Sequence, residues 1–209
     1  MQIDTNYIHI IGSTVLACVH ALVWGYVFYM KKPEKRQAIF ITFLAGSTAV
    51  FPILLYKYLW NFFPWINVFK FADNYQDNYI GFSKLAILPL SIIFTFILVG
   101  IIEEFMKNFA VRLTDDEFIK NIDDAIVLSI IAALGFSFTE NIMYFYNIWS
   151  HQGTTNLIAP FIFRSVFSTF AHVMFSGIFG YFYGLARFAN PILHEQLKTK
   201  KIDSFFEWI

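Results

Sequence analysis

The sequence predicts an all-α fold, a polytopic bundle of transmembrane helices with about five spans and additional interfacial helices. Of its 209 residues, 57% are hydrophobic and 21% are aromatic. Only 14% are charged, whereas about 25% are charged in a typical soluble domain. We therefore expect one integral membrane domain over residues 1–209. The net charge of zero offers no basic face for nucleic acid, and the single cysteine excludes an intramolecular disulfide framework.

Five stretches are long and apolar enough to cross a bilayer, which takes about 20 residues. They run over about 7–30, 38–62, from 82 into 96–109, 125–149 and 158–188. Two further segments mix aromatic with charged residues, as interfacial segments do. These are "FPWINVFKFADNYQDNYIG" after the second span and the tail "NPILHEQLKTKKIDSFFEWI".

Lysine and arginine predict the orientation of these spans. No basic residue precedes Lys31, so the first span lacks the basic n-region of a signal peptide and is expected to remain uncleaved. With the N-terminus outside and the C-terminus cytosolic, the cytosolic segments hold eleven of the fifteen Lys and Arg residues, in line with the positive-inside rule. We expect a multi-pass protein of the cell membrane, and the heavy use of Phe, Ile, Lys and Asn indicates a prokaryote.

Six ionisable residues within the predicted spans are candidates for a site, because a charge there is costly and normally faces the bundle interior or a water-filled cavity. They come from the third, fourth and fifth spans: Glu103, Glu104, Lys107, Glu140, Arg164 and His172. Glu140 lies about 15 residues, roughly 22 Å, inside its span, too deep for its carboxylate to reach the interface. The default interpretation of such residues is a functional site.

Helical spacing indicates that these residues can converge. Residues four apart share a helix face, which groups Phe136 with Glu140 and Tyr144, and Asn141 lies beside Glu140. On the fifth span a polar or small residue recurs every fourth position: Arg164, Ser168, His172, Ser176, Gly180 and Gly184. Three helices each offering one polar face predict a shared internal site.

Structural interpretations compete with this site. Glu103 and Glu104 could lie at the cytosolic interface, where charges cost little, and Arg164 could be a counter-ion for Glu140. Gly180 and Gly184 have the small-xxx-small spacing of helix packing. His9 and His20, in the first span, are interpreted as hydrogen-bonded core residues. At the start of the fourth span, we expect a helix N-cap at Asp123 or Asp124.

Three motifs in order resemble the PrsW family of intramembrane proteases, relatives of the CAAX-processing and Abi (bacteriocin-processing) membrane proteases. They are "EEFMK" at 103–107, "FSFTEN" at 136–141 and "AHVMFSGIFGY" at 171–181. The resemblance covers a core of about 85–190. It departs from the family pattern at Ser129 and Ala133, where relatives often have glycine, and in the number of spans.

The resemblance implies an intramembrane endopeptidase that cleaves membrane-anchored protein or peptide substrates, such as an anti-sigma factor. It implies four catalytic residues: Glu103, Glu104, Glu140 and His172. The supporting residues would be Lys107, Asn141, Arg164, Phe136 and Ser176. In a poorly solvated pocket a carboxylate works as a general base near neutral pH, so we expect Glu103 to activate water and His172 to orient it or to stabilise the oxyanion.

Alternatives for cofactor and function stay open at this point. If a metal takes part, its ligands would be Glu103, Glu104, Glu140 and His172, with zinc as the candidate. Because catalytic zinc sites usually offer two or three histidines or a Cys with His, we favour a glutamic-type protease without a cofactor. The other function classes are a non-catalytic membrane scaffold or chaperone of the same superfamily and a proton-coupled transporter, since buried Glu, Arg and His also build proton relays.

Overall fold

The computed structural model describes residues 5–31, 35–77, 79–83, 86–114 and 118–199. They form two compact units, one built from Met1–Thr48 with Lys107–Ile209 and the other from Ala49–Met106. The prediction of an all-α helical bundle is confirmed, with one small two-stranded sheet added to it.

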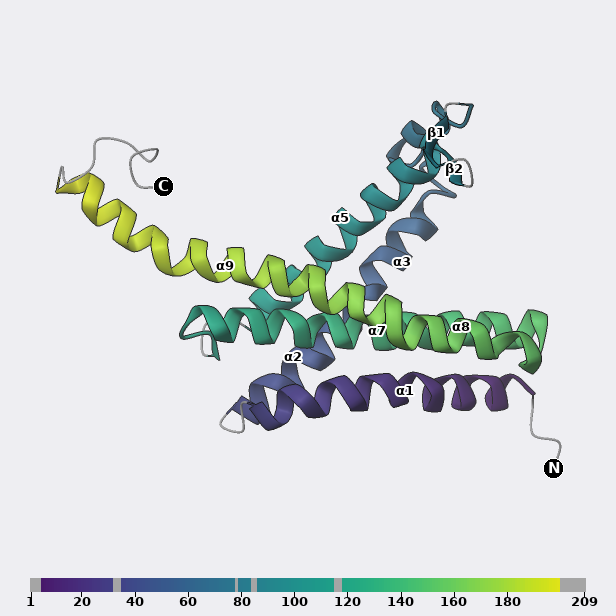
Figure 1. Cartoon of the computed structure of the whole chain (residues 1–209), viewed down its shortest axis with the longest axis horizontal. Coiled ribbons are helices and arrows are strands. Elements are labelled where there is room, and N and C mark those ends of the chain that lie inside the picture. The colour runs from purple at the N-terminus through teal and green to yellow at the C-terminus, as the bar shows by residue number, and fades with distance from the viewer. Residues whose placement is uncertain (1–4, 32–34, 78, 84–85, 115–117, 200–209) are drawn as a thin grey trace. The chain divides into compact units, whose positions relative to one another are not determined.

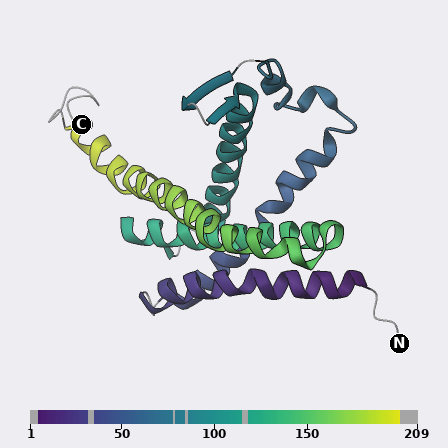
Figure 2. The ribbon, with the colours of Figure 1, turned by 45° about the vertical axis from the view of Figure 1, so that its right-hand side comes forward.

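The first unit is organised around one long central helix, α7. Its helices are α1 (Thr5–Lys31), α2 (Arg36–Thr48), the last turns of α5 (Leu90–Leu113), α7 (Ile122–Gln152), α8 (Ile158–Phe163) and α9 (Thr169–Lys198), with a short 3-10 turn η3 (Thr154–Leu157) and a π-helical turn η4 (Arg164–Ser168). α7 packs against α9, α2 and α1, and α1 runs alongside it while α9 crosses it (Figure 1, Figure 2). In the 18-residue apolar stretch of α7 that could cross a membrane, 61% of the residues are buried, whereas the share for α1 is 17%. α7 is therefore the core of the unit.

The start of α7 differs from the predicted cap. The N-cap is Asn121, whose side chain accepts a hydrogen bond from the backbone N–H of Asp124 (2.9 Å), so the expectation of Asp123 or Asp124 is wrong. Asp124 is instead buried and forms an ion pair with Lys35. A buried carboxylate needs such a partner, and this pair joins the start of α2 to the start of α7.

Glycines let the helices of this unit approach closely. A Cβ on Gly135 of α7 would lie 2.1 Å from the carbonyl oxygen of Phe43, and one on Gly46 of α2 would lie 2.1 Å from that of Ala132. On α9, a Cβ on Gly180 would meet Ser129 at 2.7 Å. The packing role predicted for Gly180 and its neighbour a turn later is confirmed, since both face α7.

Replacing Gly135 by alanine is expected to destabilise the protein by about 1–3 kcal/mol, because the methyl group would overlap backbone atoms of α2 that cannot move aside alone. Gly25 is the matched control, since a Cβ there meets nothing within 4 Å and alanine favours a helix. Thermal unfolding in detergent measures both. Equal melting temperatures for the two variants would contradict the close packing of α2 on α7.

The second unit contains α3 (Val50–Leu59), the turn η2 (Pro64–Ile66), α4 (Lys70–Asp73), strands β1 (Tyr79–Ser83) and β2 (Ala86–Pro89), and α5 up to Met106. The strands pair antiparallel with Ile80 opposite Leu88. Aromatic rings pack between α5 and the segment around the end of α4, with the ring of Phe94 4.9 Å from that of Tyr75 and 5.7 Å from that of Phe71. This segment was expected to be interfacial, and its aromatic and charged composition is the basis of that prediction.

Four helical segments are long and apolar enough to cross a membrane: Thr5–Met30, Arg36–Leu59, Ile122–Gln152 and Thr154–Lys198. They match the first, second, fourth and fifth predicted spans, and the chain is a multi-pass membrane protein. The third predicted span corresponds to α5, which has 24 residues. Every stretch of 18 residues within α5 contains Glu103, Glu104 and Lys107. The four segments above each have an apolar stretch of this length with at most two charged residues, and α5 does not.

The second span is divided where α2 ends and α3 begins. Pro52 has no N–H, so the carbonyl of Thr48 loses the hydrogen bond that a regular helix would supply there. The hydroxyl of Thr139 on α7 donates to the neighbouring carbonyl of Ser47 (3.0 Å). The boundary between the two units lies at the same place, since the second unit begins at Ala49, one residue before α3.

Candidate active site

Glu140 is held by two side chains of the chain segment that follows α7. Its Oε2 accepts hydrogen bonds from Nη2 of Arg164 (2.6 Å) and from Nε2 of His172 (3.2 Å). The side chains of Arg164 and His172 are 12% exposed, and that of Glu140 is 29% exposed. The carboxylate is thus paired with a cation inside the bundle, as a buried charge requires, yet it remains partly accessible.

His172 is fixed from both sides of its ring. Its Nδ1 lies 2.8 Å from Nζ of Lys107, a side chain that is only 2% exposed. An ammonium group can only donate, so Nδ1 of the neutral ring accepts and the ring proton sits on Nε2, which donates to Glu140. Phe136 supports this arrangement, because its ring lies 4.7 Å from Nζ of Lys107 and 5.9 Å from the imidazole.

Asn141 extends the network to α1. Its Oδ1 accepts from Nε of Arg164, and its Nδ2 lies 2.6 Å from Nε2 of His20 and 3.3 Å from Oγ of Ser137. The guanidinium has no acceptor, so the amide oxygen must face Arg164 and the amide nitrogen must donate to His20. Both Asn141 and His20 are buried, and Asn141 gives Arg164 a second acceptor besides Glu140.

A π-helical turn brings Arg164 and His172 to the same carboxylate. Over η4 the backbone N–H of Thr169 bonds to the carbonyl of Arg164, five residues earlier, and the Thr169 hydroxyl donates to the same oxygen (2.9 Å). Arg164 and His172 are eight residues apart, which in a regular α-helix would place their side chains about 80° apart around the helix axis. Because the π-helical turn contains one extra residue, this angle falls to about 20°. The fifth span is therefore not the uninterrupted helix that was predicted.

We call this set the polar cluster, and five predicted site residues belong to it with His20: Lys107, Glu140, Asn141, Arg164 and His172. Phe136 packs against it, and Tyr144 lies under Arg164 with its ring 4.5 Å from the guanidinium carbon. Ser176 is buried on α9, one turn after His172. Glu103 and Glu104 are half-buried on α5 in the other unit.

The polar cluster as it stands does not fit a metal ion. Both ring nitrogens of His172 are engaged by side chains of the protein, and Oε2 of Glu140 already accepts two hydrogen bonds. Two cationic side chains, Lys107 and Arg164, lie against these groups and would repel a metal cation. Over the described ranges, no three His, Cys, Asp or Glu side chains are grouped so that they could hold a metal.

His20 is the site residue that the sequence interpretation set aside. It was expected to be a hydrogen-bonded core histidine, which it is, but its partner is Asn141 of the candidate site. No spacing rule relates residue 20 to residue 141, because the two lie on different helices. The available signal was the position of a histidine in the middle of the apolar stretch "LACVHALVW", in a span without Asp, Glu, Lys or Arg.

Replacing His20 by leucine is expected to lower the free energy of unfolding by about 1–3 kcal/mol, because the buried Asn141 amide loses an acceptor. Glutamine at position 20 carries a carbonyl oxygen near the place of Nε2 and should restore most of the stability. Denaturant unfolding of the two variants in detergent measures this. If leucine and glutamine behave alike, the hydrogen bond to Asn141 does not contribute to the stability of the site.

Comparison with known proteins gives a family for the chain. A sequence model described as "PrsW family intramembrane metalloprotease" matches residues 34–207. The chain is also 27% identical over 168 residues to "Protease PrsW" of Geobacillus kaustophilus (strain HTA426), an alignment that covers 78% of this chain and 61% of that protein. The chain thus spans about three fifths of the length of this curated relative.

No solved structure matches the chain, so the family rests on the sequence match. That match extends over well more than half of the chain and includes all three motifs around the polar cluster and on α5. α1, with His20, lies before it. On this basis, the chain belongs to the PrsW family.

Proposed function

We propose that this protein is an intramembrane endopeptidase in which a glutamate activates the attacking water. The observation that carries the proposal is the state of Glu140. Inside a membrane helix bundle, one of its oxygens is fixed by Arg164 and His172, and the other, Oε1, accepts no hydrogen bond from the described residues. A partly exposed carboxylate oxygen held in a fixed orientation is suited to bind and orient water.

The proposed catalytic role of each glutamate depends on the hydrogen bonds that its carboxylate already makes. Glu140 holds the water through Oε1, since its Oε2 is occupied by a guanidinium and an imidazole. Glu103 takes a proton from the water as its oxygen attacks the peptide carbonyl carbon, and Glu104 beside it supports this base. The same proton then passes to the leaving amine nitrogen as the C–N bond breaks. General base catalysis of this kind contributes about 10²–10⁴-fold.

His172 and Lys107 supply charge stabilisation. Held by Lys107, His172 keeps its ring proton on Nε2. This N–H donates to Glu140 in the free protein and passes from there to the oxygen on which negative charge develops. A positioned donor of this type is worth about 2.7–4 kcal/mol in acyl-transfer enzymes. Glu103 precedes Lys107 by four residues on the continuous helix α5, so the two share a helix face.

The proposed mechanism uses no metal, although the family description includes the word metalloprotease. The support for this choice is the polar cluster itself, in which cations of the protein occupy the surroundings of Glu140 and His172. The proposed substrates are membrane-anchored proteins or peptides, because the candidate site is carried by membrane-length helices. An anti-sigma-factor-like protein is one example of such a substrate.

Reconstitution in liposomes tests the proposal. The protein is combined with a mixture of single-span membrane proteins, and new peptide termini are mapped by mass spectrometry. We expect new termini with the wild type and with Glu195→Gln, a control for the loss of an exposed carboxylate on α9. Glu103→Gln and His172→Ala, each verified as folded, should produce none.

Each outcome bears on a separate part of the proposal. Termini from Glu103→Gln but not from Glu104→Gln would move the base to its neighbour. Termini from Glu103→Gln, Glu104→Gln and His172→Ala alike would show that the assigned site is wrong. No termini from any protein, with substrates that relatives do cleave in the same liposomes, would replace the protease by a non-catalytic scaffold.

Removal of metal ions should leave the cleavage rate unchanged. The reason is that His172 and Glu140 are engaged by protein donors, so no bound ion is needed to hold them. The measurement compares rates before and after incubation with a strong chelator, with the metal content of the purified protein determined in parallel. Loss of activity on chelation, restored by zinc, would replace the glutamate mechanism by metal-assisted hydrolysis.

A further inference from the structure

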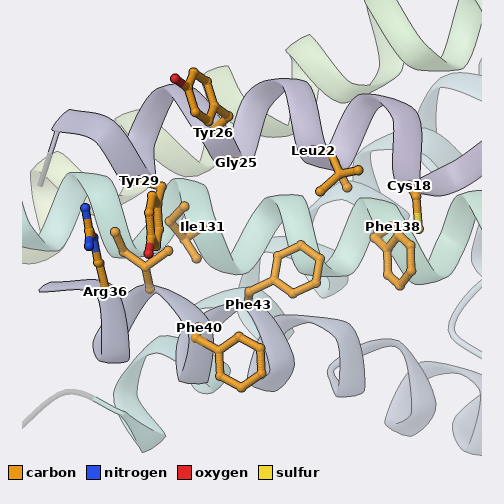
Figure 3. Close-up of a pocket in the computed structure, with 12 residues that line it drawn as sticks. Cys18, Leu22, Gly25, Tyr26, Tyr29, Arg36, Phe40, Phe43, Ile131 and Phe138 are labelled. Carbon is orange, nitrogen blue, oxygen red and sulfur yellow. The ribbon is translucent and has the colours of Figure 1, made fainter. Parts of the chain in front are cut away.

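An apolar groove runs along the first unit between α1, α2 and α7, and none of the residues that line it belongs to the polar cluster. It has a volume of about 440 Å³ and is lined by residues from all three helices. Figure 3 shows Arg36 and Tyr29 at one end of it and Cys18 and Phe138 at the other. Several lining side chains are largely exposed, among them Leu22 at 69%, so the groove is open along its side.

The length of the groove corresponds to one leaflet of a bilayer. Cys18 and Tyr29 are eleven residues apart on α1, which is about 16 Å along a helix. The hydrocarbon core of a bilayer is about 30 Å thick, so one leaflet contributes about 15 Å. With Arg36 at the level of the headgroups, Cys18 therefore lies close to the depth at which acyl chains end.

The chemistry of the groove changes along its length. Arg36, the charged residue among those that line it, lies at one end, with its guanidinium 4.7 Å from the centre of the Tyr29 ring. The neighbouring Lys35 is already paired with Asp124 and with the carbonyl of Phe118. Arg36 is exposed and makes no ion pair with any described side chain, so it can meet an anionic group.

A peptide segment suits this groove poorly. In a membrane every peptide N–H and C=O needs a hydrogen-bond partner, and the walls between Leu22 and Phe138 are hydrocarbon and aromatic. A helix is about 10–12 Å wide, so one turn of it would fill about the whole volume. An acyl chain has no polar groups to satisfy, and it is narrow enough to lie along the groove.

We propose that this groove binds an anionic phospholipid, with one acyl chain between α1 and α2 and the phosphate at Arg36. The basic segment "KKPEKR" at residues 31–36 adds to the attraction, because Lys and Arg near a membrane surface favour anionic lipids. This lipid site is separate from the proposed proteolysis, and its test involves no substrate cleavage.

Native mass spectrometry of the purified protein tests the site directly. The protein is offered equal amounts of phosphatidylglycerol and phosphatidylcholine with identical acyl chains. We expect one phosphatidylglycerol to be retained with roughly fivefold preference, the effect of about one basic residue at a lipid surface. Equal retention of the two lipids, or retention of neither, would overturn the proposal.

Matched variants separate the headgroup from the acyl chain. Arg36→Gln should abolish the preference for phosphatidylglycerol while a lipid is still bound, and Lys198→Gln, at an exposed lysine of α9, should not. Gly25→Leu places a side chain in the groove, since Gly25 lines it and nothing lies within 4 Å of its Cβ position. It should lower retention of both lipids severalfold, whereas Gly100→Leu, at an equally open glycine of α5, should not.

A measurement on the wild type alone removes the question of misfolded variants. Phosphatidylglycerol with a photoreactive diazirine at the end of one acyl chain is added, irradiated and mapped by peptide mass spectrometry. We expect labelling near Cys18 or Phe138, at the inner end of the groove. Labelling confined to other helices would overturn the proposal. In the variant experiment above, equal lipid retention by Gly25→Leu and Gly100→Leu would also overturn it.

Discussion

Replacing Glu140 by glutamine is expected to lower the rate of peptide cleavage by about 100-fold or more. The amide keeps the shape of the side chain but cannot supply the negative charge that holds Arg164 at 2.6 Å and His172 at 3.2 Å. A misplacement of about 1 Å in a reacting group costs about 10²-fold in rate. Initial rates at saturating substrate, measured in liposomes, report this loss.

The control for this prediction is Glu195→Gln, which removes an exposed carboxylate from the last turns of α9. It should leave the rate unchanged. Glu140→Asp is a second informative variant, because it keeps the charge but shortens the side chain by one methylene, so that Oε2 cannot reach both donors. Wild-type rates for Glu140→Gln would remove Glu140 from the catalytic set.

Replacing Arg164 by glutamine should have the largest effect on stability, about 3 kcal/mol of unfolding free energy. Removing one partner of a buried ion pair leaves the other charge uncompensated, at a cost of about 3–5 kcal/mol. We expect the low end of this range because the Glu140 side chain is 29% exposed. Arg164 also donates to the buried Asn141, which would lose its partner as well.

A double-mutant cycle identifies the source of this cost. Arg164→Gln combined with Glu140→Gln removes both charges, so the double variant should be more stable than the sum of the two single effects predicts. Denaturant unfolding in detergent micelles gives the four free energies. Arg112→Gln is the control, since exposed Arg112 packs on the ring of Tyr183 at 5.3 Å, a contact worth about 0.5–1 kcal/mol. Strict additivity would contradict the ion pair.

Much of the fold was predictable because a membrane span is encoded locally. Length and apolar composition alone identify the four membrane-length helical segments. The details that were missed depend on contacts over long distances. The burial of Asp124 follows from its pairing with Lys35, 89 residues away, and the division of the second span involves a hydroxyl of α7. Such partners cannot be identified from one helix at a time.

The candidate site was likewise predictable where it depends on the periodicity of one helix, and not where it depends on contacts between helices. The face of α7 with Phe136, Glu140 and Tyr144 follows from helical periodicity; Glu140 belongs to the polar cluster and the other two contact it. The meeting of Arg164 and His172 does not follow from regular spacing, because it depends on the extra residue in η4. The contribution of His20 depends on how α1 packs, which its own apolar sequence leaves undetermined.

The π-helical turn accommodates one residue more than a regular helix would need between Arg164 and His172. Val166 within it is 53% exposed, so many side chains should be tolerated there. Deleting that one residue would restore regular α-helix with seven residues from Arg164 to His172, and seven residues leave two side chains about 20° apart around the axis, so Arg164 would still face Glu140. Natural variation in this stretch should thus include the loss of one residue as well as substitutions, because the orientation of Arg164 is kept in both cases.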